Sequence, residues 1–242
     1  MDYVNYLKLA SDWFLDLIFP IRCLGCSLFG RYVCRSCLNS IPLRQSFECV
    51  GCKRRVPFGR TCILCRHDNA VGELFIVANY KDKLVERIIR YYKYRFIGDL
   101  SAPLFLLVRK YFKTVIARKN FNPFLDNPVI MPAPLHWRRL NWRGFNQSAL
   151  LAKALADYFQ LEYADPLIRL RTSSPQADIK ERDSRLQNVV GLFACRDKKA
   201  IDGRSILLVD DVCTTGATLN ECAKTLKAAG AVKVAALVVA RG

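Results

Sequence analysis

The stretch ILLVDDVCTTGATL, residues 206–219, decides the fold and the chemistry expected of this chain. Its four leading apolar residues predict a buried strand, and Asp210 and Asp211 follow directly. A loop of Thr and Gly comes next, and we expect a helix from residue 216. Helix N-termini and Thr hydroxyls bind phosphate, and adjacent carboxylates accept hydrogen bonds from vicinal hydroxyls or help to position Mg²⁺. The stretch therefore predicts a phosphate site beside an acidic site.

An ordinary helix N-cap at Thr214 or Thr215 is the alternative interpretation. It accounts for Thr and Gly, but not for two acids at the end of a strand, where a parallel sheet presents its ligand crevice. A Walker A loop is excluded because no Lys follows the Gly.

The chain from residue 71 onward alternates apolar strands with helices. Near-continuous runs of Val, Ile and Leu are typical of strands that are buried on both faces of a parallel sheet. We expect strands at 73–80, 129–134, 205–211 and 232–240. We expect helices at 82–94, 100–118, 146–159 and 216–229. The predicted fold class is α/β with a parallel sheet.

A basic segment follows the expected strand at 129–134. Arginine offers forked donors that suit a doubly charged pyrophosphate, so this segment is a candidate site for one. The alternative is an exposed basic turn. The candidate ligands are His136, Arg138, Arg139 and Arg143.

Eight of the eleven cysteines form four CxxC pairs, and two such pairs complete a tetrahedral Zn²⁺ site. The alternatives are buried structural thiols, a disulfide framework, a redox pair and an iron–sulfur cluster, but a redox CxxC occurs singly and cytosolic thiols stay reduced. We expect two structural Zn²⁺ ions. Sequential and interleaved pairing of the four CxxC pairs both remain open. His67 lies two residues past a CxxC pair, and we expect it not to bind metal. The predicted ligands are Cys23, Cys26, Cys34, Cys37, Cys49, Cys52, Cys62 and Cys65.

The charge balance predicts a polyanionic partner. The formal net charge is +17, and residues 71–150 hold 14 basic and 5 acidic groups, hence +9 of it. Aromatic and basic residues interleave at Tyr91–Arg95, as in proteins that bind single strands, although packing is the commoner role of such tyrosines.

The apolar content of 52% excludes wholesale disorder, and the absence of an 18-residue apolar stretch predicts no membrane span. The first residues lack the basic region and cleavage site of a signal peptide, so we expect a cytoplasmic protein. An apolar stripe over residues 1–20 predicts a short docking helix that ends at Pro20.

Residues 206–218 resemble the phosphoribosyl pyrophosphate (PRPP) motif of type I phosphoribosyltransferases, which consists of apolar residues, two acids and a Thr-Thr-Gly loop. The resemblance implies that Asp210 and Asp211 hold the ribose hydroxyls and support a Mg²⁺ complex. It also implies displacement of pyrophosphate at C1′ through an oxocarbenium-like state, aided by electrostatic positioning. The residues implied to hold the 5′-phosphate are Thr214, Thr215, Gly216, Ala217 and Thr218.

Together with the CxxC pairs and the segment RGFNQ (143–147), this motif makes the chain resemble the ComF (ComFC) family of competence proteins over residues 17–242. The resemblance implies a double zinc ribbon at 21–68 and a phosphoribosyltransferase-like domain at 69–242. Further matching residues between the motifs are Arg171, Thr172, Gln176, Glu181, Arg182 and Asn188.

The resemblance also implies a role in natural transformation, with PRPP, single-stranded DNA and a helicase or another component of the DNA-uptake machinery as partners. Nothing in the sequence identifies a pocket for an acceptor base, so PRPP binding is predicted and turnover is left open. The alternative is a conventional Mg²⁺-dependent phosphoribosyltransferase acting on a small-molecule or nucleobase acceptor. A PRPP-sensing transcription regulator is disfavoured because no helix-turn-helix pattern occurs.

Overall fold

The computed structural model describes residues 20–95, 97–119, 124, 126–170 and 191–242, which belong to two compact units, Met1–Ile41 and Pro42–Gly242. The first unit contains the helix α2 (Arg35–Ser40), which is capped by the Cys34 thiol. The expected docking helix falls almost entirely outside the described residues, and the expected domain boundaries at 20 and 68 stay predictions.

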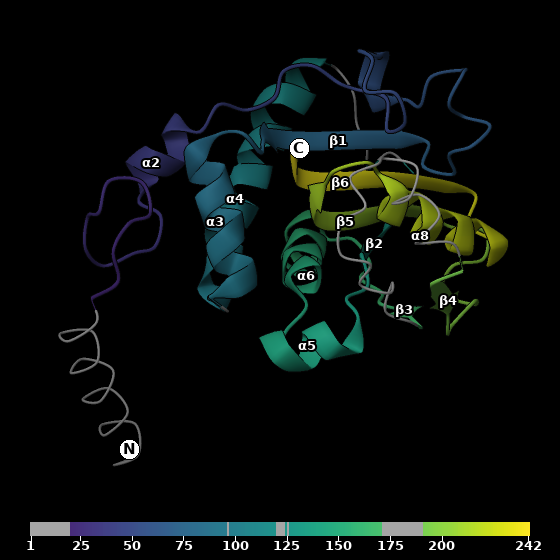
Figure 1. The fold of residues 1–242 in the computed structure, drawn as a ribbon. Helices are drawn as coiled ribbons and strands as arrows, with labels where there is room; N and C mark the ends of the chain where they lie inside the picture. Colours follow the sequence, from purple (N-terminus) through teal and green to yellow (C-terminus); the bar gives the residue numbers. More distant parts are fainter. Residues whose placement is uncertain (1–19, 96, 120–123, 125, 171–190) are drawn as a thin grey trace, which may run out of the picture. The chain divides into compact units, whose positions relative to one another are not determined.

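A four-stranded parallel sheet in the order β1-β6-β5-β2 lies at the centre of the second unit (Figure 1). Its strands are β1 (Glu73–Asn79), β2 (Val129–Pro132), β5 (Ser205–Cys213) and β6 (Lys233–Arg241). The central strands β5 and β6 are largely buried, as their Val, Ile and Leu runs require. The predicted α/β class and parallel sheet are confirmed.

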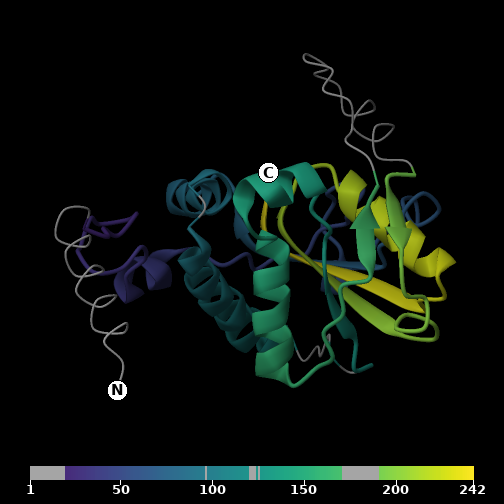
Figure 2. The same cartoon turned by 90° about the horizontal axis from the view of Figure 1, so that it is seen from below.

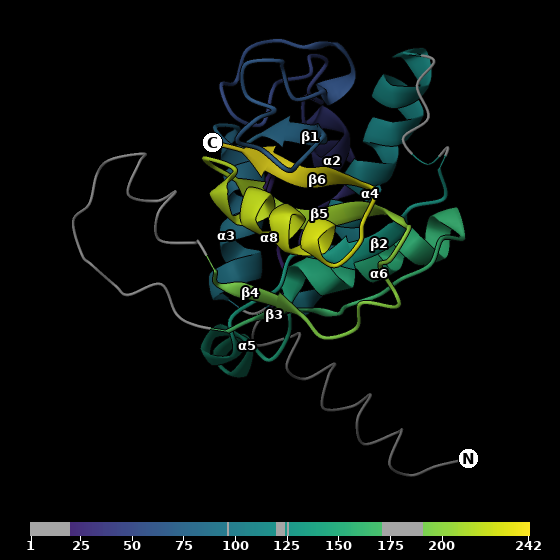
Figure 3. The same cartoon turned by 90° about the vertical axis from the view of Figure 1, so that its right-hand side faces the viewer.

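Helices cover both faces of this sheet: α8 packs on one face, and α4 and α6 lie on the other (Figure 3). Figure 2 shows α4 and α6 side by side. The helices that cover the sheet or follow its strands are α3 (Lys83–Tyr94), α4 (Ser101–Tyr111), α6 (Gln147–Phe159) and α8 (Ala217–Ala228). The core on the α8 side joins Leu219 and Leu226 to strand residues such as Leu208 and Val238.

One helix and a pair of short strands in this unit are not predicted from the sequence. Residues Trp137–Arg143 form a helix, α5, because the His136 ring caps its start and Gly144, at φ +76°, ends it. The strands β3 (Leu167–Arg169) and β4 (Phe193–Cys195) form a separate antiparallel pair. The expected helix 100–118 starts with a short turn (Gly98–Leu100) and ends early, because after Tyr111 the chain winds into a π turn (Phe112–Ile116) and a 3₁₀ turn (Ala117–Lys119).

A short 3₁₀ turn (Pro57–Gly59) lies between the last two CxxC pairs.

None of the described helices is long and apolar enough to cross a membrane.

Candidate functional site

The two acids lie at the carboxyl end of β5, as predicted, and the strand continues past them to Cys213. The Ser148 hydroxyl donates a hydrogen bond to Oδ1 of Asp210 at 2.9 Å, and the Asp211 backbone N–H donates to the same oxygen at 2.8 Å. Burial raises the pKa of Asp210 to about 6, and the charge of Asp211 adds to this effect. Asp210 therefore has two donors and an environment that disfavours its charged form.

Asp211 forms an ion pair with the basic helix α3. Lys93 Nζ lies 2.7 Å from Oδ1 of Asp211, and the exposed fractions of the two side chains are 23% and 8%. Burial opposes the charge of Lys93, but the two aspartates outweigh it and raise the pKa of the ammonium group. The acid pair is thus partly neutralised by a cation from a distant segment.

The loop after β5 forms the start of α8. Gly216 is the N-cap at φ +87°, a conformation that favours glycine, and the Ala217 N–H donates to the Thr215 hydroxyl at 3.3 Å. The first turn of a helix leaves backbone N–H groups without intrahelical acceptors, so they stay available to an anion. Thr214 is exposed, and Thr215 and Thr218 are half-buried. The loop therefore offers N–H and hydroxyl donors beside the acid pair.

The basic candidates divide into two buried and two exposed side chains. His136 is buried and accepts the Arg138 N–H at Nδ1, and burial, with the nearby arginines, lowers its pKa. Arg143 is also buried, and its Nη1 donates to Gln147 Oε1 at 3.1 Å. Arg138 and Arg139 are exposed on α5. The segment is helical and its last arginine is buried, so it is not a turn, whereas Arg138 and Arg139 are exposed as the alternative interpretation expects.

Arg143 has an unused donor near the acids. Its guanidinium packs over the Tyr94 ring at 5.7 Å, and its buried Nε has no hydrogen-bond partner among the described residues. A buried donor without an acceptor costs free energy, so an anionic ligand would stabilise this arginine. This unpaired Nε fits the predicted pyrophosphate role of Arg143.

The eight predicted ligand cysteines form two groups in which the sulfurs lie within 4.8 Å of one another. The first four cysteines form cluster 1 and the last four form cluster 2, so the pairing is sequential. Each group fits the tetrahedral Cys₄ shell of a structural Zn²⁺ ion. His67 belongs to neither cluster; its exposed ring bonds Asp68.

Backbone N–H groups hold one sulfur of each cluster. Cys34 N–H donates to Cys23 Sγ at 3.3 Å, and Cys62 N–H donates to Cys49 Sγ at 3.4 Å. Burial opposes ionisation, but these bonds outweigh it and lower the pKa of Cys23 to about 6 and that of Cys49 to about 7. Donors aimed at sulfur favour the thiolate, which is the form that binds Zn²⁺.

Comparisons with known proteins agree with this geometry. A phosphoribosyl transferase domain family matches residues 146–242, which include the acids and the predicted phosphate loop (residues 214–218). Competence protein F of Haemophilus influenzae is 25% identical over 220 residues, covering 84% of this chain and 93% of that protein. Competence protein ComFC of Bacillus subtilis strain 168 is 29% identical over 201 residues, covering 80% and 77%. DNA utilization protein YhgH of Salmonella typhimurium strain LT2 is 30% identical over 163 residues, covering 66% and 68%. The chain belongs to the ComF family.

In this ComF-family protein, sequence reasoning missed two residues of the acidic site. Ser148 follows the RGFNQ segment directly, and that proximity was the available signal. Lys93 belongs to the interleaved aromatic and basic segment 91–95, for which both DNA binding and packing are open. It pairs with Asp211, and the neighbouring Tyr92 is buried with its hydroxyl bonded to Gln147 O at 2.9 Å. No local spacing connects Lys93 with the acids.

Cys213 ends β5 just before the Thr-Gly loop, and burial raises the pKa of its thiol to about 11. The family-matching residues between 171 and 188 lie outside the described residues. The ligand roles of the acids, the loop and the arginines stay predictions.

Proposed function

We propose that this ComF-family protein binds PRPP with Mg²⁺ at the edge formed by the acid pair, the phosphate loop and Arg143, and acts in the cytoplasm in the uptake of single-stranded DNA. The observation that carries the proposal is the meeting of Asp210 and Asp211 with the α8 N-terminus at one end of β5. The names of the relatives, competence protein and DNA utilization protein, support the DNA-related part.

The site provides a partner for each part of PRPP. The carboxylates accept hydrogen bonds from the ribose hydroxyls, and the N–H and hydroxyl groups of Thr214–Thr218 donate to the 5′-phosphate. The unused Nε of Arg143 is a donor for the pyrophosphate. The oxygens of Asp210 and Asp211 suit a hard cation, and Mg²⁺ would reduce the negative charge of the pyrophosphate.

Calorimetry with PRPP and Mg²⁺ tests this part. We expect binding by the native protein and its loss when Asp210→Asn and Asp211→Asn are combined, with zinc content unchanged. Retained affinity in the double variant would show that PRPP binds elsewhere. The enzyme alternative is tested separately: background release of pyrophosphate with every nucleobase and nucleic acid offered would reject turnover and leave a PRPP-binding protein.

Exposed aromatic residues favour a single-stranded DNA surface on α5 and at the end of α3. Trp137, Trp142 and Tyr94 are 55%, 59% and 56% exposed. Two of them lie on the same short helix as Arg138 and Arg139, and the Arg138 guanidinium lies 5.3 Å from the Trp137 ring centroid. Exposed rings interleaved with arginines bind single strands, because bases stack on the rings and phosphates pair with the cations.

Fluorescence anisotropy with a labelled oligothymidylate tests this surface. Replacing Trp137 and Trp142 by Ala should weaken binding about tenfold or more, since stacking contributes about 1–3 kcal/mol per base. Val232→Ala, at a side chain that is 69% exposed, is the matched control and should bind normally. If the Trp137/Trp142 double variant binds as tightly as Val232→Ala, α5 is not part of the binding surface. If the native protein does not bind the oligothymidylate, the proposed binding of single-stranded DNA is rejected.

A further inference from the structure

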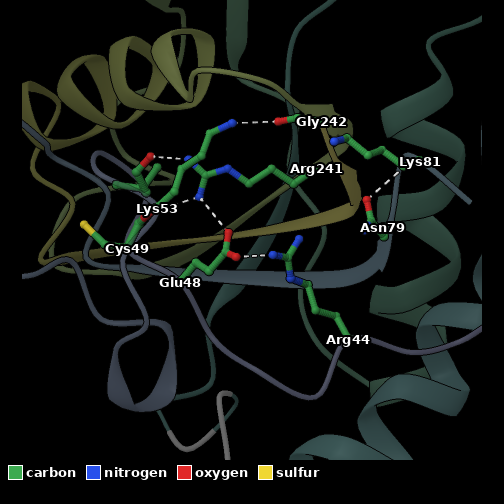
Figure 4. Close-up of polar contacts among 9 residues, drawn as sticks. Arg44, Glu48, Cys49, Lys53, Asn79, Lys81, Arg241 and Gly242 are labelled. Carbon is green, nitrogen blue, oxygen red and sulfur yellow. Dashed lines mark hydrogen bonds and ion pairs between the residues drawn. The ribbon is translucent and has the colours of Figure 1, made fainter.

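Cluster 2 lies in the same compact unit as the phosphate loop, and a buried arginine holds its first CxxC turn against the sheet. Arg241, the last residue of β6, is 3% exposed. Its Nη1 donates to Cys49 O at 2.9 Å and its Nη2 donates to Val50 O at 2.6 Å (Figure 4). The backbone of the turn between two metal ligands is thus bonded to the end of a central strand.

Charged neighbours hold this arginine and the turn. Glu48 Oε2 lies 3.7 Å from Arg241 Nη1, and Glu48 also pairs with Arg44 (Figure 4). Lys53, which follows the turn, donates to Gly242 O at 2.8 Å. Arg241 and Lys53 therefore both join the first CxxC turn of cluster 2 to the end of β6 and the residue that follows it.

The same turn packs against the phosphate loop. Val50 is fully buried in the core that includes Cys213 and Leu219. A Cβ added to Gly216 would lie 3.0 Å from Val50 Cγ2 and 3.4 Å from Val50 O. The N-cap of α8 therefore packs directly on Val50, which lies between the two ligands Cys49 and Cys52 of this turn.

The segment that follows the second CxxC turn of cluster 2 contacts the start of α8. Asn220, in the first turn of α8, accepts the Ala70 N–H at 2.6 Å and donates through Nδ2 to Asp68 O at 2.9 Å. Asp68 and Ala70 follow Cys65, and Asn69 between them donates to Cys65 O at 2.8 Å. Both ligand turns thus reach the N-terminal turn of α8, one through Val50 and one through Asn220.

We infer that metal binding at cluster 2 positions the α8 N-terminus, so that the phosphate affinity of the loop depends on this cluster and not on cluster 1. The inference rests on the proposed function, since PRPP is the expected ligand of the loop. The metal–sulfur bonds hold the four sulfurs of the cluster together. Without the metal the thiols take up protons and no bond joins the two turns, so metal loss separates the turns that support Gly216 and Asn220. Loop N–H groups bind an anion well only when they are already oriented.

Matched cysteine variants of the full chain test the inference. Cys26→Ser and Cys52→Ser each replace the second cysteine of the first turn, in cluster 1 and cluster 2 respectively. Calorimetry should show PRPP–Mg²⁺ affinity that falls on the order of tenfold in Cys52→Ser and stays native in Cys26→Ser, with zinc counted in both. Equal loss in both variants, or loss in neither, would overturn the inference.

Asn220→Ala keeps all eight ligand cysteines and provides a second test if Cys52→Ser does not fold. We expect two zinc ions per chain, weaker PRPP binding, and faster hydrogen exchange of the amides at 214–219 than in the native protein. Native exchange in this variant, together with native affinity, would overturn the coupling through α8. Arg241→Met removes both hydrogen bonds to the first CxxC turn and should speed exchange of the same amides. Arg241→Lys keeps one donor nitrogen and should retain most of the native protection from exchange.

The exchange measurement separates this inference from the proposed function. If the native protein does not bind PRPP, the proposed function fails. The coupling is then still tested, because exchange at 214–219 is compared between Cys52→Ser and Cys26→Ser without ligand. Faster exchange in the cluster 2 variant alone supports the coupling, and equal rates overturn it.

Discussion

Lys93 Nζ lies 2.7 Å from Oδ1 of Asp211, and this ion pair joins α3 to the carboxyl end of β5. The lysine compensates one of two adjacent carboxylates in a largely buried site, while Asp210 is compensated by hydrogen bonds from Ser148 and the backbone. The acid pair is therefore held in place before any ligand arrives.

Lys93→Met should destabilise the protein by about 3 kcal/mol, because it leaves Asp211 as an uncompensated buried charge. Urea unfolding measures the change. Lys83→Met, at an exposed lysine on the same helix, is the control and should change stability by less than about 0.5 kcal/mol. Adding Asp211→Asn to Lys93→Met should recover part of the loss. If the changes in the free energy of unfolding of the two single variants simply add in the double variant, the pairing of Lys93 with Asp211 is contradicted.

Asp210→Asn should stabilise the protein at pH 7.5 while removing a residue of the proposed PRPP site. The pKa of Asp210 is about 6 in the fold and about 3.9 in an unfolded chain. The folded state therefore binds this proton more tightly, and the stability from this group is full below about pH 4 and lost as pH rises through about 6.

Melting temperatures across this pH range measure the effect. The variant should melt about 2–4 °C above the native protein at pH 7.5 and should lose this advantage near pH 4. Asp157→Asn, at an exposed carboxylate on α6, is the control and should melt with the native protein. A variant that melts lower at pH 7.5 would show that the charge of Asp210 stabilises the fold.

Cysteine variants distinguish the two pairings of the zinc ligands. With sequential clusters, the chain binds two zinc ions, and changing Cys23, Cys26, Cys34 and Cys37 to Ser leaves one. When one turn of each cluster is changed to Ser, no zinc ion stays bound; the residues changed are Cys23, Cys26, Cys49 and Cys52. Native mass spectrometry counts the ions, and interleaved sites would reverse the two results. Chelation should unfold the ligand turns, since structural zinc contributes on the order of 10–16 kcal/mol.

Salt should weaken binding of single-stranded DNA. The logarithm of the binding constant falls with the logarithm of salt concentration, with a slope of about −0.7 for each phosphate contact. Replacing Arg138 and Arg139 by Ala should make this slope shallower by about 1.4. Arg204→Ala, away from α5 and paired with Glu162, is the control. An unchanged slope in the α5 variant would show that these arginines do not contact phosphates.

The sequence by itself determined what depends on short stretches of chain. The strands of the parallel sheet follow from runs of apolar residues, and the predicted ends lie within two residues of the observed ones. The acids, the Thr-Gly loop and the CxxC turns are likewise local patterns, whose chemistry is set by neighbours in sequence. Helix α5 was missed because its start depends on a histidine ring as cap, which is a rarer signal than Ser, Thr, Asp or Asn.

Only the tertiary structure decided which distant groups meet. It placed Lys93 on Asp211, grouped the cysteines sequentially, buried Arg143, and brought Arg241 to Cys49, a residue 192 positions away. These contacts join segments that fold into separate elements, and no periodicity or spacing along the chain encodes them. The physical reason is that burial and electrostatic pairing depend on distances in space, which the order of strands in the sheet establishes.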